Sequence, residues 1–232
     1  MALHLEAVTF DVHDADSAAA FWAGLLEREV VPELGGVLVP GGESQVGLRF
    51  VMSDSEQVGA RRLHLHLTSK SVEDQQATVD KALALGGRHL DVGQEPDAGY
   101  VVLADPQDNE LCVIEPGNNF LAGTGHLGEV TCDGTRDVGV FWHQALGWPL
   151  VWDEDEETAI QSPLGGTKVS WGGPPVNPRH GRNRQRLDLV ADDASAGVER
   201  LVSLGAAVLA ELDDGIELAD PDGNEFGLRL EA

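Results

Sequence analysis

The chain has 232 residues, and its 40 acidic side chains outnumber its 15 Lys and Arg side chains, which gives a formal net charge of −25 at pH 7. A surface with this excess of negative charge repels nucleic acids and anionic membranes. The 2 cysteines provide no disulfide framework, and no signal-peptide pattern or long apolar run is present, so we expect a cytoplasmic protein.

The first half of the chain alternates predicted strands with two predicted helices. Apolar residues alternate over 5–12, which predicts a half-buried strand, and Asp14 or Asp16 can cap the helix that follows. Ser71 begins a capping-box pattern and predicts a second helix that ends at Gly86. The other strands of this half are expected at 28–32, 36–40, 45–51, 63–67, 88–92, 98–104 and 109–115.

The second half repeats this order of elements. A strand is expected at 126–132, and the helix that contains Phe141 and Trp142 ends near Gly147. A later helix ends at Gly205. The remaining strands with a clear pattern in this half are expected at 148–153, 157–162, 167–171 and 186–189.

One turn sequence, Asp-Pro-x-x-Asn-Glu, occurs twice, beginning at Asp105 and at Asp220. Proline at the second position presets φ for a tight turn, and an alternating apolar run predicts a strand after each copy. The repetition predicts two tandem domains, 1–117 and 124–232, joined by a linker rich in Gly and Asn at 116–125. Within each half the strand–helix–three-strand pattern occurs twice, so the chain reads as four βαβββ motifs.

This pattern resembles the vicinal oxygen chelate superfamily of glyoxalase I, bleomycin-resistance proteins, fosfomycin-resistance enzymes and extradiol dioxygenases. The resemblance rests on Phe21-Trp22 after Asp14 or Asp16, on the His-Leu-His-Leu run from His64, and on the two Asp-Pro turns. It covers nearly the whole chain and is strongest to the glyoxalase-like branch. It implies an α+β protein with a tandem glyoxalase/bleomycin-resistance/dioxygenase fold, in which βαβββ motifs form curved mixed sheets around clefts, with helices on the convex side.

Strand alternation assigns the two faces of each predicted strand. Leu63, Leu65 and Leu67 are expected beneath the helices, which turns His64 and His66 into the cleft. The same parity places on the cleft face Ala7, Thr9, Asp11, Glu110, Cys112, Glu129, Thr131, Asp133, Arg186, Asp188, Glu225, Gly227 and Arg229.

The resemblance implies a metal held by His, Gln or Glu on the first strand, His on the fifth and Glu on the eighth. At these positions the first half offers Ala7, His64 and Cys112. The second half offers Glu129, Arg186 and Gly227. Neither half holds a complete set, and an arginine repels a cation, so the favoured expectation is that no cofactor is bound.

A site built across the two halves is the alternative that the resemblance leaves open. Glu129 then joins His64 and Cys112, with His66 nearby as a fourth donor. These donors suit zinc, and iron, nickel and manganese are the other divalent metals considered. Otherwise the two histidines are hydrogen-bonded polar residues of the cleft, and Cys112 is a small buried side chain.

Aromatic and charged residues supply further candidate ligand contacts. Trp152 and Trp171 can stack on a flat ligand, and the parity of Arg186 and Asp188 points both into a cleft. Together with His64 and His66 they form the predicted ligand-binding set.

We expect a small-molecule binder without a complete metal site, with a role in resistance by sequestration or in secondary metabolism. The expected ligand is cationic or aromatic. The sequence leaves the oligomeric state open, with a homodimer as one option. The alternative is a metal-dependent lyase or dioxygenase that uses His64, Cys112 and Glu129. Glu110 and Glu225 are candidate general bases, and each can instead tether a neighbouring loop. A third reading makes one half a brace for the other.

Overall fold

The computed structural model describes residues 3–55, 58–213 and 215–230, and these form four units of one strand, one helix and three strands. The first unit comprises β1 (Leu3–Val12), α1 (Ala15–Leu26), β2 (Val31–Glu33), β3 (Gly36–Val39) and β4 (Gly47–Met52). The second comprises β5 (Leu63–Leu67), α2 (Val72–Ala84), β6 (Arg88–His89), β7 (Val101–Ala104) and β8 (Glu110–Val113). The predicted α+β class and the four βαβββ motifs are thereby confirmed.

The second half continues in the same order. Its third unit comprises β9 (Leu127–Cys132), α3 (Arg136–Leu146), β10 (Leu150–Glu154), β11 (Glu157–Gln161) and β12 (Lys168–Trp171). The fourth comprises β13 (Gln185–Ala191), α4 (Ala194–Ser203), β14 (Ala207–Leu212), β15 (Gly215–Ala219) and β16 (Glu225–Leu230). No helix in the described residues is both long enough and apolar enough to cross a membrane.

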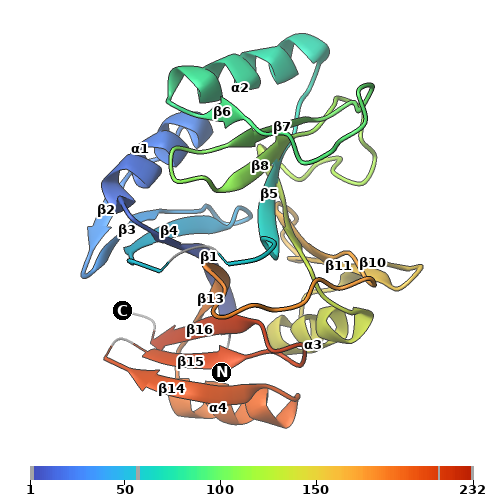
Figure 1. Ribbon diagram of the computed structural model, residues 1–232. Helices are drawn as coiled ribbons and strands as arrows, with labels where there is room; N and C mark the ends of the chain where they lie inside the picture. Colours follow the sequence, from blue (N-terminus) through green and yellow to red (C-terminus); the bar gives the residue numbers. More distant parts are fainter. Residues whose placement is uncertain (1–2, 56–57, 214, 231–232) are drawn as a thin grey trace.

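The strands form two mixed sheets, each shared between the two halves of the chain (Figure 1). The 1/4 sheet joins the first and fourth units in the order β14-β15-β16-β13-β1-β4-β3-β2. The 2/3 sheet joins the second and third units in the order β10-β11-β12-β9-β5-β8-β7-β6. In each sheet the two units meet along an antiparallel pair, β1 with β13 and β5 with β9. Any cleft on a sheet is therefore built across the two halves, and the predicted domain bounds 1–117 and 124–232 stay a prediction.

Within each half, a buried hydrogen bond joins the Phe-Trp helix to the Asp-Pro turn. Trp22 Nε1, on α1, donates to Asp105 Oδ2 at 2.8 Å, and Trp142, on α3, makes the same contact with Asp220. Because a buried indole N–H needs an acceptor, the two motifs recur together. This contact ties the first unit to the second, and the third to the fourth, although these units lie in different sheets.

The apolar faces of the strands pack beneath the helices as the alternation predicts. Leu63, Leu65 and Leu67 are at most 5% exposed and belong to the main core. Asp14 caps α1 by accepting from the backbone N–H of Ser17, so the predicted helix start is confirmed. Each helix packs against strands: α1 against β3 and β4, α2 against β6 and β8, α3 against β11 and β12, and α4 against β13, β14 and β16.

Gln45, in the turn between β3 and β4, links the two sheets. Its Nε2 donates to the Thr124 carbonyl at 2.7 Å and to Thr167 Oγ1 at 3.0 Å. Its Oε1 accepts from the backbone N–H of Leu127, the first residue of β9, at 3.1 Å. One side chain of the 1/4 sheet thus satisfies polar groups at the edge of the 2/3 sheet.

We expect Gln45→Ala to lower the free energy of unfolding by about 1–2 kcal/mol, because several part-buried polar groups lose their partner. Urea unfolding followed by circular dichroism measures the change. The matched control is Gln76→Ala on α2, whose amide donates only to Asp80 at the surface; its effect should stay below about 0.5 kcal/mol. Equal effects of the two substitutions would show that Gln45 does not link the sheets.

Candidate functional site

A cavity of about 420 Å³ opens on the histidine-bearing face of the 2/3 sheet. Its size falls within the range of small-molecule sites. One side is polar and the other apolar. Its lining includes His66, Glu129, Ser170, Phe120, Leu121 and Trp152.

The polar side is organised around His66, which lies on β5 two residues after His64. Residue 66 lies directly opposite Glu129 on the neighbouring strand β9. Its Nδ1 is 2.6 Å from Glu129 Oε2, and its Nε2 is 3.0 Å from His64 Nε2. Ser170, on β12, donates its hydroxyl to the other oxygen of Glu129. Both carboxylate oxygens are thus occupied, and the predicted cleft parity of the two histidines holds.

Cys112 lies opposite His66 on the other flank, where β5 pairs with β8. One donor atom from each of His64, His66 and Cys112 lies within 4.8 Å of the others, and these three residues form the donor cluster. Among the described residues it is the only such grouping of three or more His, Cys, Asp or Glu. The cross-half arrangement brings Glu129 to the same place.

The protonation states in the donor cluster follow from burial and neighbouring charge. Burial, reinforced by His66, lowers the pKa of His64 to about 4, so its imidazole is neutral at pH 7. Burial, together with the carboxylates Glu110 and Glu129, raises the pKa of the Cys112 thiol to about 12. Burial acts to raise the pKa of Glu129, but hydrogen bonds from His66 and Ser170 outweigh it and leave that pKa lowered. Glu129 is therefore a carboxylate at a site where His64 is neutral and Cys112 is a thiol.

The apolar side of the cavity is built in part by the segment predicted as a linker. Phe120 and Leu121 come from it, and Leu121 is anchored in a small core with Cys112. Phe120 meets Trp152 edge to face, with ring centroids 5.9 Å apart, and Lys168 Nζ lies 4.2 Å from the Phe120 centroid. An aromatic residue in a Gly- and Asn-rich stretch was the signal for this wall, and sequence reasoning missed it.

The two predicted tryptophans differ in position. Trp152, on β10, is 39% exposed and lines the cavity wall. Trp171 also borders the cavity, but it is 2% exposed and stacks on Trp142 with centroids 6.4 Å apart. Trp152 is therefore the one free to stack on a ligand, whereas most of Trp171 is core.

The corresponding place in the 1/4 sheet is filled by protein. Asp188 on β13 takes the position that His66 has on β5, and its strand neighbours are Ala7 and Gly227 instead of Glu129 and Cys112. Neither neighbour carries a metal-binding side chain. Arg49 Nη1 lies 2.8 Å from Asp188 Oδ2, so an arginine satisfies the carboxylate.

The other charged residues predicted as a ligand contact or as general bases do not line the cavity of the 2/3 sheet. Arg186 Nη1 lies 2.7 Å from Asp11 Oδ1 in the 1/4 sheet, so Arg186 and Asp188 do not share the cavity with the histidines. Glu225 accepts from the backbone N–H of Asn183 and lies 3.3 Å from Arg179, as a loop tether does. Glu110 is half-buried at the start of β8, near Cys112. The described residues that line the cavity include neither glutamate.

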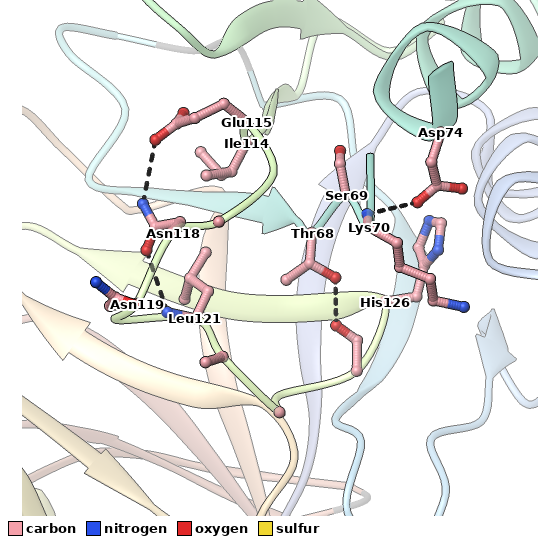
Figure 2. Close-up of a pocket in the computed structure, with 14 residues that line it drawn as sticks. Thr68, Ser69, Lys70, Asp74, Ile114, Glu115, Asn118, Asn119, Leu121 and His126 are labelled. Carbon is pink, nitrogen blue, oxygen red and sulfur yellow. Dashed lines mark hydrogen bonds between the residues drawn. The ribbon is translucent and has the colours of Figure 1, made fainter. Parts of the chain in front are cut away.

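A second cavity, of about 450 Å³, lies on the other side of the 116–125 segment (Figure 2). The two cavities share Ile114, Asn118 and Leu121, so this segment forms the wall between them. Several polar groups around the second cavity are bonded to one another: Asn118 to Glu115, and the Lys70 backbone N–H to Asp74 (Figure 2). We place the candidate site in the first cavity, which His66 of the donor cluster lines.

Comparison with known proteins agrees with this architecture. Glyoxalase I from Zea mays is 15% identical to this chain, covers 98% of it over 92% of its own length, and superposes with a TM-score of 0.71. Its V278E mutant is 13% identical at the same coverage, with a TM-score of 0.70. At this identity the likeness shows the fold. A search of curated proteins found no significant match.

A family model provides the assignment from sequence. The model described as glyoxalase-like domain matches residues 7–114 and 129–229, one segment in each half. The two matched segments together account for most of the chain and coincide with the tandem repeat. The chain therefore belongs to the glyoxalase-like domain family of the vicinal oxygen chelate superfamily.

Proposed function

We propose that this protein binds a small organic molecule in the cavity of the 2/3 sheet and that the 1/4 sheet serves as a brace. The observation that carries the proposal is the contrast between the two sheets. The 2/3 sheet leaves about 420 Å³ open between its polar and aromatic sides, whereas Arg49 fills the corresponding place in the 1/4 sheet. An open cavity with few convergent polar groups is typical of a ligand site.

The charges and rings of the cavity favour a flat, cationic ligand. Glu129 and Glu157 both line it, and the net charge of −25 attracts cations to the surface. Phe120 and Trp152 offer ring faces and edges on which an aromatic group can pack. Sequestration of such a molecule is the role that we propose.

Binding is tested with a panel of basic aromatic natural products, read by thermal stabilisation and tryptophan fluorescence. A binding compound is expected to raise the melting temperature, and Trp152→Ala should weaken its binding about 10-fold, because one stacking surface is lost. The matched control is Tyr100→Ala, which removes an aromatic residue of similar exposure, 38%, that lies outside this cavity.

A second pair of variants tests which sheet binds. We expect His66→Ala to weaken binding and Arg186→Ala to leave it unchanged, because Arg186 lies in the 1/4 sheet. Equal losses would contradict the assignment of the 1/4 sheet as a brace. A panel without any stabilisation or fluorescence change would remove the support for small-molecule binding.

A metal-dependent lyase or dioxygenase is the second candidate, because His66 of the donor cluster lines the same cavity. The cluster fits a divalent ion: two imidazoles and a thiol converge, and Glu129 supplies a carboxylate beside them. A bound ion would act as a Lewis acid on the oxygens of a substrate. Elemental analysis of protein purified without chelators tests this candidate, with about one metal per chain as the expected result. Metal-free protein that gains no stability from added zinc, iron, nickel or manganese would exclude it.

A further inference from the structure

We infer that His64, His66 and Cys112 ligate a divalent metal in this protein through two imidazole Nε2 atoms and one sulfur, and that Glu129 acts as a positioning residue for His66 instead of a ligand. The inference rests on the second candidate function above, because it requires that a metal binds. It differs from a simple transfer of the superfamily's ligand positions, which would make the first-strand residue Glu129 a ligand.

The three donor residues lie on two neighbouring strands, β5 and β8. His64 and His66 are two residues apart on β5, so both point from the same face, and Cys112 lies opposite His66 on β8. The two Nε2 atoms are 3.0 Å apart. Ligand nitrogens around tetrahedral zinc lie about 3.3 Å apart when each bond is about 2.05 Å. The histidines are therefore placed almost as a shared ion requires.

Glu129 lies between His66 and Ser170. Its Oε2 contacts His66 Nδ1, the nitrogen that faces away from His64, and its Oε1 accepts from Ser170. Because a carboxylate accepts, His66 Nδ1 donates to Glu129, and Nε2 is the nitrogen that His66 directs at the cluster. Metal-binding histidines commonly donate their second N–H to a carboxylate in this way, which fixes the tautomer and the orientation of the ring.

In the described part of the chain, the cluster contains three donors and no fourth His, Cys, Asp or Glu. His66 also lines the cavity. Three protein ligands beside an open cavity are typical of zinc sites that leave a position for water or substrate, and a nitrogen–sulfur set favours zinc over magnesium or calcium.

The test uses the full chain, stripped with a chelator and loaded with Zn²⁺ or Co²⁺. X-ray absorption of the zinc form should report one sulfur at about 2.3 Å and two imidazole nitrogens at about 2.0 Å. The cobalt form should show a near-ultraviolet thiolate-to-metal band. Cys112→Ser should abolish this band, whereas Cys132→Ser, which removes the other thiol, should leave it unchanged.

Variants of Glu129 separate a positioning role from ligation. Glu129→Ala should keep the sulfur and nitrogen shells but weaken zinc binding about 10–100-fold. Glu129→Gln should lose less, because its amide oxygen still accepts from His66 Nδ1. Three results would each overturn the inference: a thiolate band that survives Cys112→Ser, a metal shell in the wild type without sulfur, or loss of an oxygen ligand in Glu129→Ala. Failure of the natural-product panel, read on metal-free protein, would refute small-molecule binding alone.

Discussion

Arg49→Met is expected to lower the free energy of unfolding by roughly 3 kcal/mol, because three carboxylates lose their guanidinium partner and the buried Asp188 keeps only the more distant Arg229, at 3.6 Å. The guanidinium is 2% exposed and contacts Asp188, Glu6 and Glu33 at 2.8, 2.6 and 2.7 Å. Burial acts to lower the pKa of Arg49, but hydrogen bonds to Glu33 and Glu6 outweigh it and raise that pKa. Asp188 is 3% exposed, so solvent does not replace the lost contact.

Urea unfolding measures this change, with two controls. Arg88→Met removes a surface pair with Asp108, in which both side chains are more than half exposed, and should cost less than about 1 kcal/mol. The double variant Arg49→Met/Asp188→Asn should regain part of the loss, because the buried charge that lost its nearer arginine is gone. A double variant no more stable than Arg49→Met would show that the loss comes from packing and not from charge.

Asp105→Asn is expected to lower the free energy of unfolding by about 2–4 kcal/mol, although the two side chains have nearly the same shape. Four N–H groups converge on this carboxylate, which is 1% exposed. Oδ1 accepts from the backbone N–H groups of Gln107 and Asn109, and Oδ2 accepts from Trp22 Nε1 and the Asn109 amide. An asparagine keeps one acceptor but places an NH₂ group against two donors.

The same substitution in the same turn provides the control. Asp108 is exposed and has φ of 63°, a conformation that asparagine tolerates, so Asp108→Asn should change stability by less than about 0.5 kcal/mol. A double-mutant cycle of Asp105→Asn with Trp22→Phe then measures the coupling between turn and helix. If the losses of stability from the two substitutions are strictly additive, the hydrogen bond between Trp22 and Asp105 does not explain why the two motifs recur together.

Local sequence patterns were sufficient for the elements and the strand faces. The alternation at 63–67 placed the leucines beneath the helices and both histidines on the cavity side, as the structure has them. Asp14 and Ser71 cap the helices for which they were predicted. Such features depend on residues close in sequence, because side-chain direction repeats every two residues in a strand and a cap acts within one turn.

The 116–125 segment shows where local patterns fail. Its Gly and Asn residues predict a linker, yet Leu121 anchors it in a small core and Phe120 forms a cavity wall. Whether such a segment spans solvent or folds over a sheet depends on which apolar surface is available nearby. That surface exists only after the sheets have formed.

By itself, the sequence determined the family, the four βαβββ units and the side chains that each strand turns away from its helix. Only the tertiary structure decided which units share a sheet, and therefore that Glu129 meets His66 and Cys112 while Arg186 and Asp188 lie elsewhere. The physical reason is that the face to which a side chain points is a local property of a strand, because it alternates from one residue to the next. Strand pairing is decided by the summed free energy of contacts between residues far apart in the chain, which no local pattern contains.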